Sequence, residues 1–204
     1  IHLRLLLLAF FLPPKARTGE IIGGHESKPH SRPYMAYLEF VAQGVWKKCG
    51  GFLIREDFVL TALEKKAKLN AAVQPIKLPR GKDKVKPGKV CLVAGWGRVS
   101  PNGKCSNTLQ EVKLKVQKHQ VCEREEFLKE YYKSSIQICA GDPKENKASF
   151  KGDSGGPLVC NHVAQGIVSY GNKNGTPPRV YTKVSRFLQW IKETMKRHQL
   201  QETN

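Results

Sequence analysis

The sequence predicts an all-β protein, either a barrel or a sandwich, that ends in a helix. Along most of its 204 residues, short apolar runs alternate with glycine, proline and asparagine, which is typical of many short strands. One run, residues 111–116, alternates acidic or basic with apolar side chains at the period of a half-buried strand. Hydrophobic residues make up 40% of the chain, which is enough to bury a core in one domain or in one protein of two barrels.

Several stretches carry the strand pattern. Each is rich in β-branched, aromatic or other apolar residues and is bounded by turn-forming residues. The expected strands are residues 34–41, 51–54, 57–62, 89–97, 111–116, 157–160, 163–170 and 179–184. The lysine-rich tract 80–89 separates the first three from the others, and its charge predicts a solvated loop.

Two stretches are expected to be helical. Ser185 is a candidate cap for a C-terminal helix. The apolar face of that helix would consist of Phe187, Trp190, Ile191 and Met195. Residues 121–132 form a second, charged amphipathic stretch that carries Phe127 and Leu128.

The first residues predict an export signal. Arg4 precedes the apolar run 5–12, and polar residues follow it, which is the pattern of a secretory signal peptide over residues 1–18. The run is too short to cross a bilayer, and no later stretch is long and apolar enough to do so. The alternative is that the run is a buried helix of the domain. We expect a secreted protein without a transmembrane segment.

The net charge of +18 predicts affinity for polyanions. Residues 1–20 contribute three basic residues and one acidic residue, so the charge of the remainder is +16. Lysine and arginine are scattered along the chain without a nucleic-acid recognition motif, so no specific nucleic-acid ligand is expected. For a secreted protein, a sulfated proteoglycan is the expected polyanion. The alternative is that the charge only makes the surface soluble.

The six cysteines, at positions 49, 91, 105, 122, 139 and 160, are interpreted first as disulfide partners, because an exported protein meets an oxidising environment. Their spacing alone does not choose among the possible pairings. None forms a Cys-x-x-Cys pair, so no zinc site is expected. We expect no metal and no cofactor.

The string Lys-Gly-Asp-Ser-Gly-Gly-Pro at residues 151–157 carries the clearest chemical signal. Glycines on both sides of Ser154 allow a tight turn that leaves the hydroxyl exposed. They also allow the backbone amides of Gly152 and Ser154 to converge on one point, as an oxyanion hole requires. The string therefore predicts a nucleophilic serine. The alternative is a glycine-rich hairpin turn in which the serine is incidental.

This string resembles the active-serine motif of the trypsin and chymotrypsin family of serine proteases. Four other segments resemble family motifs in the same order along the chain. They are residues 21–24 (the activated N-terminus), 49–54 (the strand before the catalytic histidine), 95–97 and 169–171. The resemblance extends from residue 19 to about residue 198.

The resemblance implies a chymotrypsin-like double β-barrel in a trypsin-like protease domain over residues 21–204. What is present of the N-terminal barrel lies within residues 21–80. The C-terminal barrel, which has all its family segments, occupies residues 89–204. The C-terminal helix closes the domain.

The chain is more similar still to the granzymes and mast-cell proteases. Residues 29–36 resemble their N-terminal segment, and Gly19–Glu20 resembles the activation dipeptide of granzyme zymogens. Phe150 stands where most trypsin-like enzymes have a cysteine, and granzymes also lack that cysteine. The resemblance implies a serine endopeptidase of cytolytic or secretory granules. It also implies that, once residues 19–20 are removed, the amino group of Ile21 pairs with the buried carboxylate of Asp153 and orders the oxyanion hole.

One block of the family pattern is missing. Thr61-Ala62 is followed by Leu63, where the family continues with Ala-His-Cys and, much further on, with the strand that carries the catalytic aspartate. Residues 21–204 number 184, against roughly 200–250 for a barrel domain of this kind. The missing block would take with it both triad partners of Ser154 and about half of the N-terminal barrel strands. We expect an incomplete N-terminal barrel.

None of the remaining histidines is expected to replace the missing base. His2 lies in the leader. The others lie in segments that resemble surface loops or chain ends of the family, namely His25, His30, His119, His162 and His198. Without a base, Ser154 is a neutral alcohol and a poor nucleophile. We expect the chain as written to be catalytically inactive.

The resemblance also implies the disulfides Cys91–Cys160 and Cys122–Cys139. The family partner of Cys49 belongs to the missing block, and Cys105 has no counterpart in the family pattern. We expect Cys49 and Cys105 to be unpaired, unless geometry permits a new bond between them.

The resemblance implies a substrate pocket formed by residues 148–151, by Ser169-Tyr170-Gly171 and by residues 179–181. Ala148 stands where trypsin-like enzymes place the aspartate that binds lysine or arginine, so that specificity is not expected. Arg179 stands where granzyme B places a pocket arginine. A buried guanidinium would select a carboxylate side chain, Asp above all. The alternative is that Arg179 is a surface residue of a loop.

Three functions therefore remain open at this point. The chain is a non-catalytic granzyme relative that binds a peptide ligand, or an active protease whose written sequence lacks an internal segment, or a polyanion-binding granule protein. In addition, Asn174-Gly175-Thr176 is an N-glycosylation sequon in a Gly/Pro-rich loop.

Overall fold

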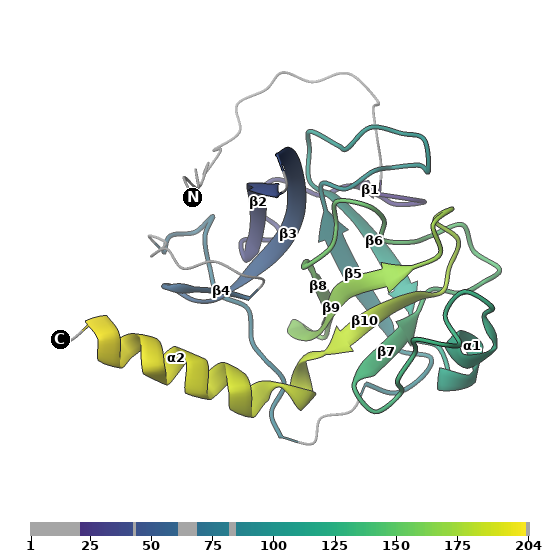
Figure 1. The fold of residues 1–204 in the computed structure, drawn as a ribbon. Coiled ribbons are helices and arrows are strands. Elements are labelled where there is room, and N and C mark those ends of the chain that lie inside the picture. Colours follow the sequence, from purple (N-terminus) through teal and green to yellow (C-terminus); the bar gives the residue numbers. More distant parts are fainter. Residues whose placement is uncertain (1–20, 43, 61–68, 82–84, 203–204) are drawn as a thin grey trace.

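The computed structural model describes residues 21–42, 44–60, 69–81 and 85–202. Figure 1 shows two sheets, with the C-terminal helix extending from the larger one. The predicted signal peptide 1–18 and activation dipeptide 19–20 lie outside the described residues. None of the described helices is long and apolar enough to cross a membrane.

The larger sheet has seven strands in the order β1-β6-β5-β8-β9-β10-β7. They are β1 (His25–Glu26), β5 (Val90–Gly95), β6 (Gln110–Lys115), β7 (Gln137–Ala140), β8 (Pro157–Cys160), β9 (Val163–Gly171) and β10 (Arg179–Lys183). A bridge between Val116 and Ala140 joins the end of β6 to β7, supported by a 2.8 Å hydrogen bond from the Gln117 amide to the Cys139 carbonyl. The sheet thereby closes into the C-terminal barrel that the resemblance implied.

Alternating side chains build the core of this barrel. In β9 every second residue from Ala164 to Val168 is buried, and in β6 the charged Lys113 and Lys115 point outward while Leu114 is buried. The period-two pattern of residues 111–116 therefore predicted both the strand and its buried face. Two disulfides hold the barrel, Cys91–Cys160 between β5 and β8 and Cys122–Cys139 beside β7, and both are pairings that the resemblance implied.

The smaller sheet is open. It consists of β2 (Met35–Ala42), β3 (Val45–Arg55) and β4 (Phe58–Leu60) in the order β2-β3-β4. No further strand of the described chain joins it. Three strands in sequence, whose two outer edges pair with no other described strand, match the expectation of an incomplete N-terminal barrel, since only a closed barrel removes strand edges.

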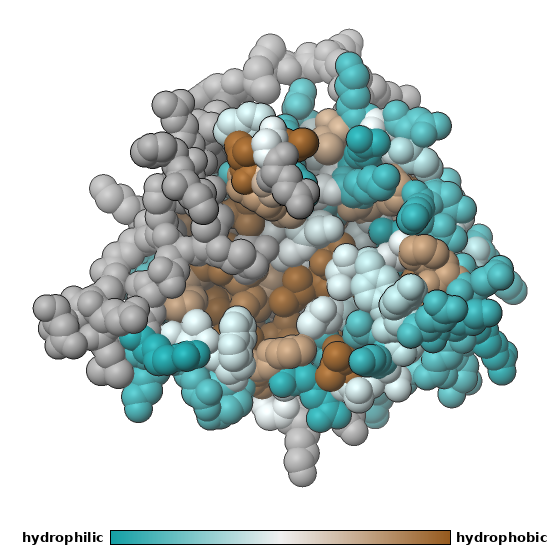
Figure 2. Space-filling view, viewed as in Figure 1, coloured by the Kyte–Doolittle hydropathy of each residue, from teal (hydrophilic) through white to brown (hydrophobic). Residues whose placement is uncertain are grey.

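Apolar side chains join the two sheets. Phe52 of β3 and Val159 of β8 belong to one buried cluster, which also contains Ile76 and Ala164. Figure 2 shows hydrophobic atoms gathered in a hollow at the centre of this face, between the two sheets. At the far end of the β2–β3 hairpin, Trp46 is 69% exposed. The open sheet thus leaves apolar surface uncovered.

The helices differ from the sequence prediction. Helix α1 (His119–Arg124) is shorter than the expected stretch 121–132, although Leu128 is fully buried and Phe127 is exposed. Helix α2 (Leu188–Glu202) begins after a 3₁₀ turn, η1 (Val184–Arg186). Ser185 therefore lies inside η1 and does not cap α2.

The expected apolar face of α2 is only partly buried. Ile191 is buried, but Trp190 is 55% exposed and Phe187 is 36% exposed. Phe187 directly precedes α2 and Trp190 lies in its first turn, and Figure 1 shows that this helix projects away from the seven-stranded sheet. A 3.6-residue period predicted the helix but could not predict how much of it would be covered.

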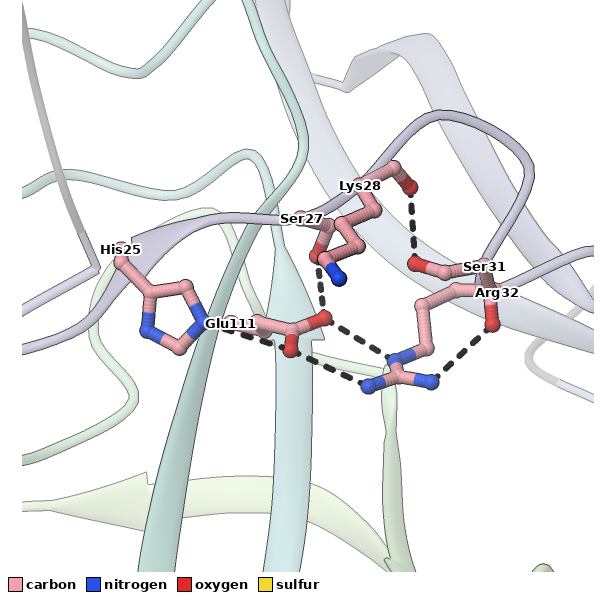
Figure 3. A network of polar contacts seen from close by, with 6 residues as sticks. All are labelled: His25, Ser27, Lys28, Ser31, Arg32 and Glu111. Carbon is pink, nitrogen blue, oxygen red and sulfur yellow. Dashed lines mark hydrogen bonds and ion pairs between the residues drawn. The ribbon is translucent and has the colours of Figure 1, made fainter.

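A polar cluster attaches the N-terminal segment to the barrel (Figure 3). Glu111 of β6 accepts two hydrogen bonds of 3.0 Å from the guanidinium of Arg32 and one of 2.6 Å from the Ser27 hydroxyl. His25 lies 3.4 Å from the same carboxylate. Burial alone would raise the pKa of Glu111, but the hydrogen bonds from Ser27 and Arg32 outweigh it and hold that pKa below its usual value. The cluster ties residues 25–32 to β6.

We expect Glu111→Gln to destabilise the fold by about 2 kcal/mol at pH 7, because Arg32 would lose its charged acceptor. Since the folded pKa of Glu111 is depressed, its contribution is present above the unfolded pKa of 4.5 and is lost as the pH falls through the folded pKa. Urea unfolding at pH 7 and pH 4 measures the difference between the two proteins. Glu145→Gln, which removes the exposed pair with Lys147, is the control and should change little. An equal loss for Glu111→Gln at both pH values would contradict this account.

Candidate active site

The serine loop lies where the two sheets meet. Gly152 and Gly155 have φ angles of 100° and 86°, which residues with a Cβ rarely adopt. They place Ser154 between two turns closed by 3.0 Å backbone hydrogen bonds, from the Asp153 amide to the Phe150 carbonyl and from the Gly156 amide to the Asp153 carbonyl. The Gly50 amide of β3 donates a 2.8 Å hydrogen bond to the Ser154 carbonyl. The open sheet therefore helps to hold the serine of the closed barrel.

The carboxylate of Asp153 is fully buried beside the loop. Its Oδ1 accepts a 2.8 Å hydrogen bond from the Gly97 amide and its Oδ2 accepts one of 2.8 Å from the Phe150 amide. A Cβ at Gly97 would lie 2.5 Å from Asp153 Oδ1, so glycine is required there. Burial raises the pKa of Asp153 to about 6, against the lowering effect of the two amides. Within the described chain no cation forms an ion pair with it.

The segment that begins at Ile21 packs against the same region. The Ile21 side chain is 1% exposed and belongs to the core of the closed barrel. The Ala148 amide donates a 3.0 Å hydrogen bond to the Ile22 carbonyl, and Ile22 forms a small cluster with Ala148 and Phe150. Residues 21–22 thus lie along the strand-like segment 148–150 that leads into the serine loop.

Arg179 is buried and faces this segment. It is the first residue of β10, pairs with Gly171 of β9 and is 7% exposed. Its Nη1 donates a 2.7 Å hydrogen bond to the Asn172 carbonyl, and its guanidinium lies 5.6 Å from the centre of the Phe150 ring. Its Nε is buried without a hydrogen-bond partner among the described residues. Burial lowers the pKa of Arg179, which the fields of Tyr181 and Asp153 oppose.

The remaining predicted pocket residues divide into two groups. A Cβ at Gly171 would lie 2.5 Å from the Arg179 guanidinium, so this glycine makes room for the arginine. Ala148 is fully buried nearby. Ser169 is exposed, and the Tyr170 hydroxyl donates a 3.2 Å hydrogen bond to Gln137. The structure therefore brings Gly171 and Arg179 together, places Ala148 in the cluster of Phe150, and directs the Tyr170 hydroxyl to a different partner.

No described side chain is in place to activate Ser154. Its hydroxyl has no hydrogen-bond partner within residues 21–42, 44–60, 69–81 and 85–202. His25 lies beside Glu111, and His119 lies 2.5 Å from the Tyr132 hydroxyl. His30 and His162 occupy exposed turn positions with φ angles of 59° and 61°. None of these four can serve as a base for Ser154 in this arrangement.

Several residues of the site were not identified as such from the sequence. The Phe150 amide donates a hydrogen bond to Asp153, and its ring lies against the Arg179 guanidinium. From the sequence, Phe150 was noted only because most trypsin-like enzymes have a cysteine at its position. Gly97 belongs to a noted family motif, but only the fold shows that its amide binds Asp153. Cys105 Sγ lies 3.5 Å from where a Cβ of Gly152 would be. Cys49 and Cys105 are both free in the structure.

Comparison with known proteins places the chain among serine proteases. The Trypsin family model matches residues 21–64 and 62–191. Granzyme B of Homo sapiens is 52% identical over 245 aligned positions that cover 95% of this chain and 98% of that protein. Granzyme B of Rattus norvegicus is 51% identical and covers 97% of this chain and 100% of that protein. A solved structure of a protein called GrC superposes with a TM-score of 0.79 at 42% identity, covering 86% of this chain and 100% of that one.

The alignment lengths show that this chain is shorter than its relatives. Since 95% of 204 residues is about 194, about 50 of the 245 positions aligned with human granzyme B have no counterpart in this chain. The family model is correspondingly matched in two pieces, which overlap on this chain at residues 62–64. The chain belongs to the trypsin family of serine proteases, and within that family it is granzyme-like.

Proposed function

We propose that this chain is a granzyme-like serine protease that, as written, lacks a working catalytic triad. The observation that carries the proposal is the Ser154 hydroxyl, which has no hydrogen-bond partner in the part of the chain that the structure describes. The break in the family match at residues 62–64 supports it, because the family histidine would follow Ala62. The residues 61–68 that bridge the break contain no histidine.

The parts that remain can bind but cannot transfer a proton. The amides of Gly152 and Ser154 would stabilise an oxyanion, and Ser154 would be the nucleophile if a base took its proton. A neutral serine hydroxyl attacks a peptide bond poorly. An oxyanion hole and substrate binding alone give about 10³–10⁴-fold acceleration over water, roughly a millionfold below a complete triad.

A turnover assay tests this proposal. The protein beginning at Ile21 is incubated with peptides that carry Asp, Met, Phe or Arg before the scissile bond, beside the Ser154→Ala variant. We expect the two proteins to be indistinguishable on all four peptides. Cleavage that disappears in Ser154→Ala would overturn the proposal.

The pocket is proposed to bind an acidic side chain, with Asp preferred. Arg179 is buried, and its Nε has no described partner. An incoming carboxylate would satisfy this group with charge-assisted hydrogen bonds, whereas an apolar side chain would leave it unsatisfied. The ligand of the inactive chain would then be an extended protein or peptide segment, with an Asp in the pocket and its backbone along Ser169-Tyr170-Gly171 as an added strand.

The proposed function also includes export of the chain and removal of its first residues. Residues 1–18 would direct secretion or storage in a granule, and removal of 19–20 would free the Ile21 amino group to pair with Asp153. The buried Ile21 side chain and the fully buried Asp153 support this part. A transcript sequence across Ala62-Leu63 distinguishes a genuinely shortened chain from an active protease whose written sequence lacks a segment.

Asn174 is proposed as a glycosylation site. It is exposed in the turn before β10, and its side chain accepts a 2.7 Å hydrogen bond from the Thr176 hydroxyl. We expect partial occupancy in secreted material, since Pro177 follows the sequon directly. Treatment with an N-glycosidase should lower the mass of the wild-type protein and leave Asn174→Gln unchanged. Full recovery of the unmodified Asn174 peptide would refute this prediction.

A second candidate function, polyanion binding, rests on the net charge of +18. A sulfated proteoglycan is the proposed partner for a secreted chain. Retention on heparin beyond physiological salt supports this function. Elution below about 0.15 M salt would argue that the charge only keeps the surface soluble.

A further inference from the structure

One edge of the three-stranded sheet is open along a whole strand. β2 is an end strand of that sheet (Figure 1), and it pairs with β3 over eight consecutive residue pairs without a register shift. The other end strand, β4, has only three residues. Of the two outer edges, β2 therefore offers the longer one to a further strand.

The hydrogen-bond pattern indicates which backbone groups of β2 face outward. The Leu53 amide donates a 2.8 Å hydrogen bond to the Tyr34 carbonyl, so these two opposite residues begin the ladder as a bonded pair. Bonded and non-bonded pairs alternate in an antiparallel ladder. The amides and carbonyls of Tyr37, Glu39 and Val41 therefore point away from β3. Among the residues that the structure describes, none of these groups forms a hydrogen bond to a further strand or loop.

The open edge lacks the usual features that prevent strand addition. β2 contains no proline and no bulge, and Glu39 is its only charged residue. That charge is balanced by Lys48 of β3, whose ammonium group lies 3.3 Å from the carboxylate. Near the end of β2, Val41 is 51% exposed, and the exposed Trp46 lies directly opposite it on β3. A long edge without net charge and with exposed apolar side chains is a template for another strand.

The relatives indicate why this edge is open. About 50 of the positions aligned with human granzyme B have no counterpart here. The two matched pieces of the family model overlap at residues 62–64, shortly after β4. A sheet that closes into a barrel has no free edge, whereas a shortened one keeps its edges. A strand from another molecule can therefore take the place beside β2 that the described chain leaves open.

A second copy of this chain fits the edge in one register. Two β2 strands related by a twofold axis pair antiparallel, through the outward groups of residues 37, 39 and 41. An axis at Glu39 would place two like charges opposite each other. An axis nearer the start of β2 is blocked, because the Tyr37 ring packs against Trp96, with 5.4 Å between the ring centres. An axis at Phe40 avoids both problems, since Glu39 then lies opposite Val41 of the second copy.

We propose that this chain dimerises by antiparallel pairing of β2 with β2 of a second copy, about a twofold axis at Phe40. Each of the two pairs of Glu39 and Val41 exchanges both its hydrogen bonds, and the two Phe40 rings meet at the axis. The two open sheets become one sheet in the order β4-β3-β2-β2-β3-β4. The net charge of +18 opposes the approach of two copies, so salt that screens this repulsion strengthens the dimer.

Sedimentation velocity of the protein expressed from the full chain tests the proposal. The protein is measured over a series of micromolar concentrations, at about 0.05 M and about 0.5 M salt. We expect a monomer–dimer equilibrium that shifts toward the dimer at the higher salt. Val41→Glu should raise the dissociation constant of the dimer about tenfold or more, because each dimer then opposes two pairs of like charges. Val41→Lys should bind at least as tightly as the wild type, because it opposes Glu39 with a positive charge.

Two further variants serve as controls. Val90→Glu makes the same change at a valine of β5 that is 54% exposed, and it should leave the dissociation constant within about twofold of the wild type. Val41→Pro removes only an amide that points away from β3, so it should abolish the dimer and keep the β2–β3 hairpin. It replaces Val41→Glu as the test if that variant does not fold.

Each other outcome would overturn the proposal. A monomer at every concentration and at both salt concentrations would exclude the dimer. Equal weakening by Val41→Glu and Val41→Lys would show an unspecific apolar contact in place of paired strands. Weakening by Val90→Glu as large as that by Val41→Glu would place the interface elsewhere. A monomer that instead binds an added peptide with the sequence of a strand from the missing family block would assign the edge to a strand of another protein.

Discussion

Insertion of the missing family block is expected to raise peptide turnover about a millionfold. The insert is a granzyme segment that carries the Ala-His-Cys and aspartate-strand elements, placed between Ala62 and Leu63. The histidine would take the proton of Ser154, the aspartate would orient it, and the added strands would extend the open sheet. The new cysteine would also give Cys49 its family partner. Initial rates of the chimera and the present chain on an Asp peptide measure the effect.

The same chimera tests the pocket. We expect it to cleave after Asp faster than after Glu, and much faster than after Leu or Lys, because the buried Arg179 guanidinium is costly to leave unpaired. Arg179→Gly removes that group and should abolish the preference. A chimera that prefers Leu or Phe would contradict the assignment of Arg179. So would an Asp preference that survives Arg179→Gly.

Asp153→Asn is expected to have opposite effects before and after processing. In the full chain, the buried carboxylate has no described ion-pair partner and its pKa is raised to about 6. Because this folded pKa exceeds the unfolded value of 3.8, the carboxyl contributes stability below the unfolded pKa, and this is lost as the pH rises through about 6. This loss of stability amounts to about 3 kcal/mol. Asp153→Asn should therefore compare increasingly well with the wild type as the pH rises from 4 to 7.

In the protein that begins at Ile21, the new ammonium group should lower the pKa of Asp153 below its unfolded value. The carboxylate then contributes stability above the unfolded pKa that is lost as the pH falls. Asp153→Asn would break a buried ion pair and cost about 3–5 kcal/mol at neutral pH. Urea unfolding of both proteins and both variants at pH 4 and pH 7 measures these slopes. The same slope in processed and unprocessed protein would show that Ile21 does not pair with Asp153.

Most strands could be predicted because their apolar runs and turns are local signals. Strands β8, β9 and β10 lie within one residue of the predicted bounds. The first part of β3 was missed because Lys47 and Lys48 hide it, and only pairing with Phe40 and Glu39 of β2 makes it a strand. The start of α2 was also predicted wrongly, because Ser185 looks like a helix cap in the sequence but is part of a 3₁₀ turn.

The candidate site was likewise predictable only where its features depend on local sequence or on family resemblance. The turn at Ser154 and the need for glycine beside it follow from one short string, and the pairing Cys91–Cys160 follows from family resemblance. The partners of Asp153 could not be predicted, because Gly97 donates through its backbone and lies 56 residues away in the chain. The burial of Arg179 under Phe150 likewise depends on three segments meeting, which no local pattern records.

A serine-reactive fluorophosphonate distinguishes a Ser154 that is present but not activated from one that a base activates. The reagent phosphonylates a serine only when an adjacent base raises its nucleophilicity. The protein beginning at Ile21 and an intact granzyme are labelled side by side, and the labelled peptide is identified by mass spectrometry. We expect labelling of the granzyme and none above the Ser154→Ala background for this chain. Stoichiometric labelling at Ser154 would show that the serine is activated.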